Sequence, residues 1–255
     1  MSSTAEVTID AFLGGRLWLA QAGQGHRAGL DAVMLAAAAR VEAGDRVLDA
    51  GAGMGVVGLC IASRVRDCTV TGIEIDPGLS KLAAANAARN GLDRRHSAIS
   101  ADLTAPLPDL APLGVLPESF EVVVANPPFY RHGQATPSLA SGRARAAIMP
   151  EGGLEGWVRF MAAMAAPGGA LVLVQPAAEL PELLSALDGC CGGIVVFPLF
   201  PRSGGPAHRI IVSGRKGSRA PLVIRQGLVV HGGGNAFTPE AEAVLRDGAA
   251  IDLYV

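Results

Sequence analysis

The chain has 255 residues, of which 50% are hydrophobic and 17% charged, so it can bury a sizeable core and is not a mainly disordered chain. Its four cysteines form no CxxC pattern and its five histidines show no metal-ligand spacing, which argues against a zinc site and a disulfide framework. The net charge is −2, yet residues 127–150 and 189–239 contain Arg and Lys and no acid. If the fold joins these two segments, they make a positive face that can meet phosphates.

Apolar strands alternate with helices from residue 31 onward, after an irregular, polar segment over 1–30. Helical spacing of apolar residues predicts helices at 31–42, 55–66, 78–91, 153–166 and 179–189. Short β-rich runs predict strands at 46–50, 69–75, 97–101, 121–126, 169–175, 193–198 and 207–214. This alternation predicts an α/β fold, doubly wound, with a mostly parallel sheet and helices on both faces. Its ligand crevice would lie at the carboxyl ends of the strands.

Neither a signal peptide nor a membrane span is predicted. Glu6 and Asp10 stand where a signal peptide needs a basic region, and prolines and glycines interrupt the uncharged run 160–178. We therefore expect a cytoplasmic protein that binds neither a membrane nor a metal, folded as a single domain over 1–255.

The first chemical motif is Asp49-Ala50-Gly51-Ala52-Gly53-Met54-Gly55, which follows a strand and opens a helix. Its glycines let the backbone turn sharply and let a ligand approach closely. Val56 stands where the dinucleotide fingerprint needs a small residue, which argues against a nicotinamide oxidoreductase. The Asp49 carboxylate suits the ammonium of an amino-acid moiety, so the motif indicates S-adenosylmethionine as the cofactor.

Acids also end the next two strands. Glu74 lies about 20 residues after the glycine turn, the distance at which an acid accepts hydrogen bonds from the ribose hydroxyls of an adenosine. Asp76, directly before Pro77, is predicted to cap the following helix. Asp102 is read either as a contact to the adenine amine or as a turn residue.

The most specific motif is Asn126-Pro127-Pro128-Phe129, directly after an apolar strand. The two prolines fix the backbone, so the Asn126 side-chain carbonyl and the Pro127 backbone carbonyl can converge on one planar NH2. Phe129 offers a face for stacking of a planar base or amide. The motif therefore indicates a site that receives a planar NH2 group.

The order of these motifs resembles that of the class I S-adenosylmethionine-dependent methyltransferases. More narrowly, four segments resemble the bacterial tRNA adenine-N6 methyltransferases that modify an anticodon-loop adenine: GHRAGLDAVMLA from Gly25, DAGAGMG, ANPPFY and HRIIVSGRKG from His208. The resemblance covers residues 12–250. It implies an RNA substrate, most simply tRNA, and a seven-stranded sheet whose last strand is antiparallel.

The resemblance also implies residue roles, which we state as expectations. The cofactor would be held by Arg27, Asp31, Asp49, Gly51, Gly53, Glu74, Asp102 and Asn126. The catalytic platform would be Asn126, Pro127, Pro128 and Phe129. The substrate would be bound by Phe129, Tyr130, Arg131, Arg202, Arg209 and Lys216. Residues 1–45 would cover the cofactor, and 130–152 would form a mobile loop.

Three other functions remain open from the sequence. A protein glutamine-N5 methyltransferase would offer a planar amide to the same two acceptors, and a ribosomal RNA guanine-N2 methyltransferase would offer a different amine. A non-catalytic module that binds the cofactor or RNA is the third, although the intact Asn126 and Glu74 count against it.

Overall fold

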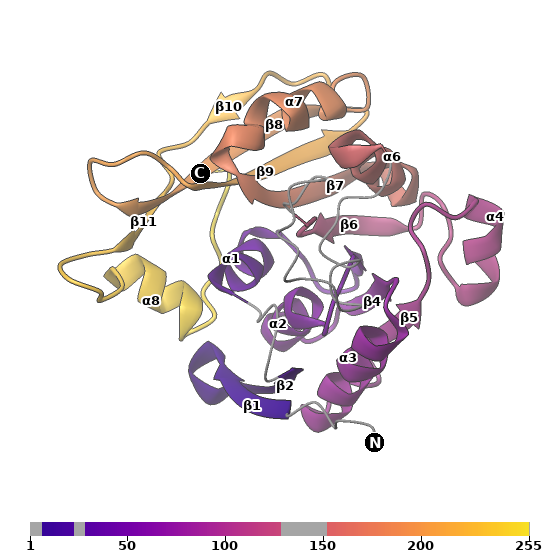
Figure 1. The fold of residues 1–255 in the computed structure, drawn as a ribbon. Coiled ribbons are helices and arrows are strands. Elements are labelled where there is room, and N and C mark those ends of the chain that lie inside the picture. Colours follow the sequence, from indigo (N-terminus) through magenta and orange to yellow (C-terminus); the bar gives the residue numbers. More distant parts are fainter. Residues whose placement is uncertain (1–6, 23–28, 129–151, 255) are drawn as a thin grey trace, which may run out of the picture.

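The computed structural model describes residues 7–22, 29–128 and 152–254, which are drawn in colour in Figure 1. The strands of its main sheet are β3 (Arg46–Ala50), β4 (Thr69–Glu74), β5 (His96–Ser100), β6 (Phe120–Ala125), β7 (Ala165–Pro176), β8 (Cys191–Arg202), β9 (Arg209–Lys216), β10 (Val223–Ile224) and β11 (Leu228–His231). Their order is β10-β8-β9-β7-β6-β3-β4-β5, and β11 also pairs with β8. β9 is antiparallel to β7 and β8, and the other pairs of this sheet are parallel.

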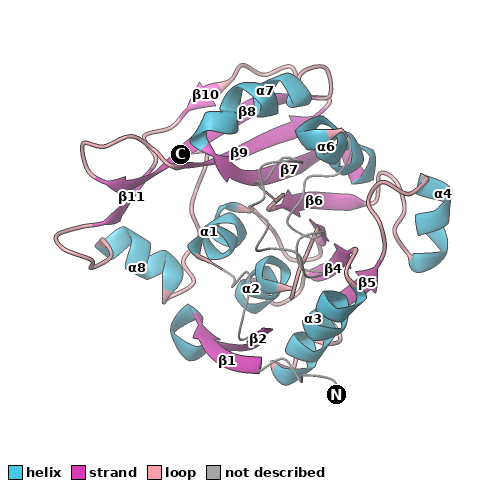
Figure 2. Cartoon of the chain, in the orientation of Figure 1, coloured by secondary structure: helices cyan, strands magenta, loops and turns pink. Residues whose placement is uncertain are grey.

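Helices cover both faces of this sheet, as Figure 2 shows. They are α1 (Leu30–Ala38), α2 (Val56–Arg64), α3 (Pro77–Arg89), α4 (Leu107–Leu110), α6 (Gly153–Met164), α7 (Leu180–Leu187) and α8 (Pro239–Leu245). Short 3-10 turns are η1 (Leu13–Gly15), η2 (Ala111–Leu113) and η4 (Ala177–Glu179).

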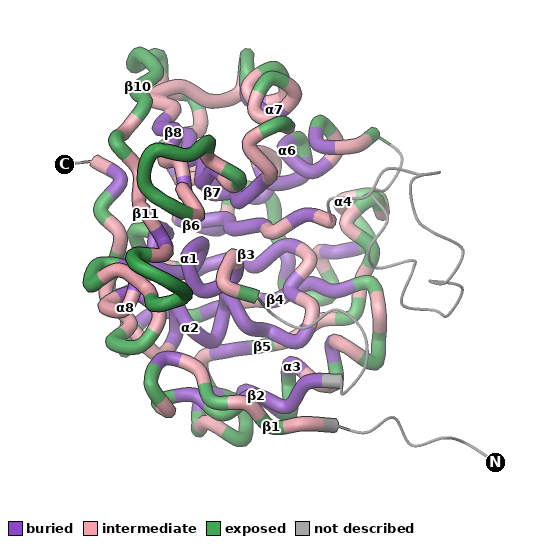
Figure 3. Tube along the Cα trace, turned by 60° about the vertical axis from the view of Figure 1, so that its left-hand side comes forward, coloured by how far each residue is buried: buried purple, intermediate pink, exposed green. Residues whose placement is uncertain are grey.

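Side chains of the central strands alternate between two buried clusters, because successive strand residues point to opposite faces. In β6, Val122 and Val124 pack with α1 and α2, whereas Val123 and Ala125 pack with α6 and α7. The central strands are accordingly buried in Figure 3. The predicted doubly wound α/β class and all seven predicted strands are confirmed, with β9 as the antiparallel strand. β10 and β11 are additional edge strands that the sequence did not reveal.

Close packing of α2 on the sheet depends on Gly58. A Cβ at Gly58 would lie 2.8 Å from both His96 Nε2 and Val70 Cγ1, so a larger residue would push the helix away from the strands. Burial lowers the pKa of His96 to about 4, so this histidine is neutral and acts as a packing group. The helix start that carries the glycine turn is therefore held firmly against β3 and β4.

Residues 1–30 are not irregular where they are described. They form a hairpin of β1 (Val7–Phe12) and β2 (Leu17–Ala22), whose Leu17, Leu19 and Gln21 are buried. The outer edge of β2 pairs with side chains of α3 and of its C-cap: Asn86 Oδ1 accepts from the Ala20 N–H at 2.7 Å, and Asn90 Oδ1, at the C-cap, accepts from the Trp18 N–H at 2.9 Å. Each asparagine also donates from its Nδ2 to the carbonyl of the same β2 residue.

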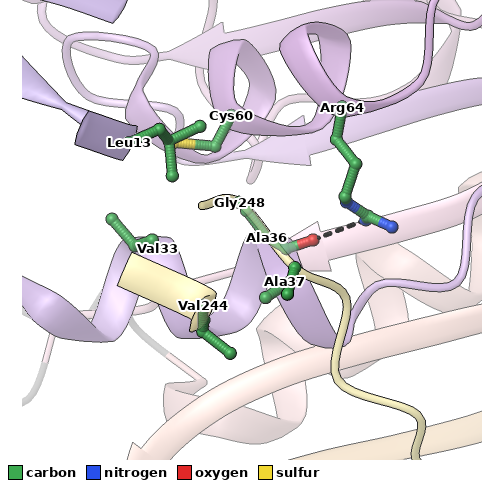
Figure 4. Close-up of a pocket in the computed structure, with 9 residues that line it drawn as sticks. Leu13, Val33, Ala36, Ala37, Cys60, Arg64, Val244 and Gly248 are labelled. Carbon is green, nitrogen blue, oxygen red and sulfur yellow. Dashed lines mark hydrogen bonds between the residues drawn. The ribbon is translucent and has the colours of Figure 1, made fainter. Parts of the chain in front are cut away.

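Residues far apart in the sequence meet beside α1. The Arg16 guanidinium donates to the Asp247 carbonyl, and the Ile251 N–H donates to the Ala37 carbonyl at 2.9 Å. Figure 4 shows the small apolar hollow at this junction, with Leu13, Cys60 and Val244 on its wall. Burial raises the pKa of the Cys60 thiol to about 12, so it is unreactive. The junction is a packing feature.

Two classes of structure are absent from the described ranges. None of the helices there has the length and apolar character that a bilayer span requires. Nor does any group of His, Cys, Asp and Glu in these ranges have an arrangement that could hold a metal ion.

Candidate active site at the carboxyl ends of the strands

The glycine turn follows β3 and has a backbone that strongly favours glycine. Gly51, Gly53 and Gly55 have φ angles of +69°, +56° and +87°, a region that residues with a Cβ rarely adopt. The Ala52 N–H donates to the Ile73 carbonyl at 2.8 Å, which ties the turn to β4. The turn is thus preformed at the end of β3, with no Cβ at Gly51, Gly53 and Gly55.

Asp49 lies beneath this turn and is 1% exposed. Its Oδ2 accepts a hydrogen bond from the Gly58 N–H at 3.0 Å. Burial raises the pKa of Asp49 to about 7, and the nearby charge of Glu74 adds to the effect, while the Gly58 hydrogen bond opposes it. A cation bound beside Asp49 would favour its ionised form.

Glu74 ends β4 and is 6% exposed. Its Oε2 accepts from the Gly53 N–H and its Oε1 from the Asp76 N–H, both at 2.9 Å. Burial raises the pKa of Glu74, and these two hydrogen bonds oppose the shift. The carboxylate is therefore fixed in orientation beside the glycine turn, with lone pairs left for further donors.

The two other acids near this edge have local partners. Asp76 caps α3, as predicted, because its Oδ1 accepts from the N–H groups of Gly78 and Leu79 at 2.7 and 3.1 Å. Asp102 Oδ1 accepts from the Thr104 N–H at 2.8 Å and from its hydroxyl at 2.7 Å. Of its two readings from the sequence, the structure shows the turn, and contact with an adenine stays a prediction.

The Asn-Pro-Pro segment begins directly where β6 ends. Asn126 Oδ1 is buried and has no hydrogen-bond partner in the structure. Pro127 is buried and Pro128 half-buried. Because β3 and β6 are paired neighbours, Asn126 follows the strand next to that of Asp49. An unpaired acceptor at a strand end is what a site for an amine N–H requires.

Several predicted residues lie outside the described residues. They are Arg27, Phe129, Tyr130 and Arg131, together with nearly all of the loop predicted over 130–152.

The predicted basic face is divided between the two edges of the sheet. Arg202 and Arg209 lie at the carboxyl edge with the motifs, since Arg209 pairs with Pro176 at the end of β7. Because β9 runs antiparallel, Lys216 lies at the opposite edge, where its Nζ donates to Glu118 and to the Ala165 carbonyl, each at 2.9 Å. The structure therefore does not bring Lys216 to the site.

Asp31 and Arg209, assigned to different roles from the sequence, contact each other. Arg209 Nε donates to Asp31 Oδ2 at 2.8 Å, which joins the start of α1 to the start of β9. Arg202 donates to the Gly232 carbonyl at 3.2 Å and lies at the surface.

Three residues of the site edge were missed by the sequence reasoning. Ile75 is 55% exposed directly after Glu74, an apolar side chain in the open beside a nucleotide-type turn. The Trp157 ring on α6 lies against Gly51, and Gln175 is a fully buried amide at the end of β7. Of these three, only Ile75 could have been found from the sequence, because it is an apolar residue between two acids at a predicted strand end.

The known proteins whose sequences resemble this chain are methyltransferases. Residues 28–154 match the family model described as the methyltransferase small domain. A tRNA1(Val) (adenine(37)-N6)-methyltransferase from Porphyromonas gingivalis ATCC 33277 is 32% identical over 180 residues, 68% of each chain. The enzyme of that name from Aeromonas hydrophila is 29% identical over 73% of this chain and 75% of its own. The one from P. gingivalis W83 is 32% identical, and the alignment covers 64% of each chain, just under two thirds.

Solved structures show the same fold. A crystal structure described as a predicted O-methyltransferase from Agrobacterium tumefaciens has a TM-score of 0.73 and 28% identity, covering 88% of this chain and all of that one. An S-adenosylmethionine-dependent O-methyltransferase from Thermotoga maritima has a TM-score of 0.50 at 18% identity, covering 74% of this chain and 63% of its own.

Proposed function

Because this chain belongs to the methyltransferase small domain family, as a relative of the tRNA1(Val) adenine-N6-methyltransferases, we propose that it methylates the N6 amine of an adenine in tRNA. The methyl donor is S-adenosylmethionine, and the reaction takes place in the cytoplasm, where tRNA is found. The observation that carries the proposal is the buried, unpaired Asn126 Oδ1 at the end of β6, beside the glycine turn.

The residues present fit this cofactor. Gly53 has open space where a Cβ would stand, which leaves room for close approach, whereas the Trp157 ring fills that space at Gly51. Glu74 holds an oriented carboxylate for the ribose hydroxyls, and Asp49 offers a buried carboxylate for the ammonium. Ile75 offers an apolar surface for the adenine ring. When bound, S-adenosylmethionine supplies an electrophilic methyl group on a sulfonium.

The chain's own residues position and polarise the amine. Asn126 Oδ1 and the Pro127 carbonyl accept the two N–H groups of the target amine, so its lone pair is directed away from the ring plane. The same acceptors stabilise the positive charge that develops on nitrogen. Cys60, with a pKa near 12, and the neutral, buried His96 take no part as bases.

The first test is transfer of labelled methyl to separate pools of unmodified tRNA, ribosomal RNA and protein. We expect label in the tRNA pool, recovered on digestion as N6-methyladenosine. Label in guanine of ribosomal RNA or in protein glutamine would contradict the proposed substrate and support one of the two alternative enzymes.

Cofactor affinity should depend on the ionisation of Asp49. The cofactor ammonium binds the ionised carboxylate, whereas the free protein holds Asp49 at a pKa of about 7. Affinity should therefore rise several-fold between pH 6 and pH 7.5, because binding at the lower pH must first displace a proton. Titration calorimetry in buffers of different ionisation enthalpy would also detect the released proton.

The matched control for this prediction is Asp49→Asn, which keeps the shape of the side chain. It should bind the cofactor more weakly and lose the part of the pH dependence that comes from Asp49. An equal pH dependence in both proteins would contradict the role of Asp49.

A further inference from the structure

One amide side chain on α3 contacts both the N-terminal hairpin and the glycine turn. Asn86 is fully buried, and its Oδ1 accepts from the Ala20 N–H at 2.7 Å. Its Nδ2 donates to the carbonyls of Ala20 and Met54, each at 3.1 Å. Met54 stands between Gly53 and Gly55 in the glycine turn. Asn86 thus joins the hairpin directly to the turn.

Asn86 and Asn90 together pair with β2 as a neighbouring strand would. Each accepts from the N–H and donates to the carbonyl of one β2 residue, Ala20 for Asn86 and Trp18 for Asn90. The spacing permits this, because four residues along a helix and two residues along a strand each cover about 6 to 7 Å. α3 and β2 accordingly lie side by side in Figure 1. These four hydrogen bonds, here called the clasp, hold the edge of β2 that faces away from β1.

The two asparagines differ in one contact. Among the hydrogen bonds of the described residues, Asn86 Nδ2 also donates to the Met54 carbonyl, whereas Asn90 Nδ2 also donates to the Asn86 carbonyl at 2.7 Å. The helix packs on the turn next to this contact, since a Cβ at Gly55 would lie 3.1 Å from the Ala83 Cβ. The clasp is therefore connected to the glycine turn through Asn86 and not through Asn90.

The turn that Asn86 holds is part of the cofactor site. Gly53 directly precedes Met54, has open space where a Cβ would stand, and donates its N–H to the Glu74 carboxylate. If the hairpin leaves α3, the Asn86 amide loses two of its three described hydrogen bonds and is freer to turn away from Met54. A turn that is less fixed binds the cofactor less tightly, because part of the binding free energy must then order the turn.

We propose that Asn86 is a positioning residue of the cofactor site, which couples the N-terminal hairpin to the glycine turn so that cofactor binding and the clasp strengthen each other. The inference rests on the proposed function, because it takes S-adenosylmethionine as the ligand of the turn. Coupling between two such equilibria is reciprocal. The clasp should therefore raise the affinity for the cofactor, and the cofactor should protect the hairpin from opening.

The first test compares Asn86→Leu with Asn90→Leu, which is the matched control. Each variant removes two hydrogen bonds of the clasp, but Asn90→Leu leaves Asn86 bound to both Ala20 and Met54. Titration calorimetry with S-adenosylmethionine should show an affinity roughly tenfold lower for Asn86→Leu, as for one lost hydrogen bond, and within about twofold of native for Asn90→Leu. Because the defect of Asn86→Leu lies in binding, its kcat should recover at saturating cofactor.

The second test uses the native protein, so it decides the question even if Asn86→Leu does not fold. Hydrogen exchange would be compared for residues 7–22 with and without saturating S-adenosylmethionine. We expect the cofactor to slow exchange of this segment roughly tenfold, the same factor as in the first test. Residues 191–202 of β8 are the reference for a general gain in stability, because β8 lies at the other end of the sheet from β4 and β5, which α3 connects.

The outcomes distinguish the inference from the function on which it rests. Native protein that does not bind S-adenosylmethionine would contradict the proposed function. Native protein that binds it, but whose hairpin is protected no more than residues 191–202, would overturn the inference alone. Native cofactor affinity in Asn86→Leu, even with a lowered Tm, would overturn it too, because Asn86 would then have a structural role only. An equal loss of affinity in both variants would do the same.

Discussion

Asn126→Ala should lower methyl transfer by about a thousandfold or more and change cofactor affinity by less than about twofold. The variant removes the buried acceptor that holds and polarises the target amine, while Asp49, Glu74 and the glycine turn keep their contacts. Single-turnover transfer to tRNA and calorimetric titration with S-adenosylmethionine measure the two effects separately.

Asn126→Asp is the matched control, because it keeps a side-chain oxygen in the same place. It should retain far more activity than Asn126→Ala. Equal loss of cofactor binding and of transfer in Asn126→Ala would show that the residue supports the cofactor site, and our assignment would then be wrong.

Glu74→Ala should weaken S-adenosylmethionine binding by roughly a hundredfold, as expected for loss of two charge-assisted hydrogen bonds to the ribose. It also removes the acceptor for the Gly53 N–H, so the glycine turn keeps only the Ala52-to-Ile73 backbone hydrogen bond of its two described hydrogen bonds to β4. Because the defect lies in binding, kcat at saturating cofactor should recover most of its native value.

Glu74→Gln retains the length of the side chain and one carbonyl acceptor, so its affinity should lie between those of the native protein and Glu74→Ala. A variant with native affinity but reduced kcat would place Glu74 in the chemical step and exclude the ribose role.

Local sequence predicted the central fold well because each element carried its own signal. β3, β4 and β6 are short apolar runs that end in glycine, acid or proline, and the helices between them have regular apolar spacing. Asp76 and Pro77 likewise predicted the start of α3 correctly. The hairpin of β1 and β2 was missed because part of what holds it is distant in the sequence: the edge of β2 away from β1 pairs with Asn86 and Asn90, some 70 residues further along the chain.

The sequence motifs of the site could be predicted, but which residues the fold brings together could be predicted much less well. Charge counting grouped Arg209 with Lys216, but a strand of eight residues carries its two ends to opposite edges of the sheet. Gln175 and Trp157 were invisible because a missing hydrogen-bond partner is a property of the folded environment and not of the residue type. The pairing of Asp31 with Arg209 joins residues 178 positions apart.

The junction of Arg16 with Asp247 also constrains when the protein can finish folding. These residues are 231 positions apart, and Gly14 packs against the carbonyl of Arg246 in the same place. During synthesis on the ribosome, the hairpin of β1 and β2 emerges long before Arg246 and Asp247, so it cannot form these contacts at first. The central strands can assemble earlier, but the hairpin and α1 gain these contacts only once residues 246–251 have left the exit tunnel.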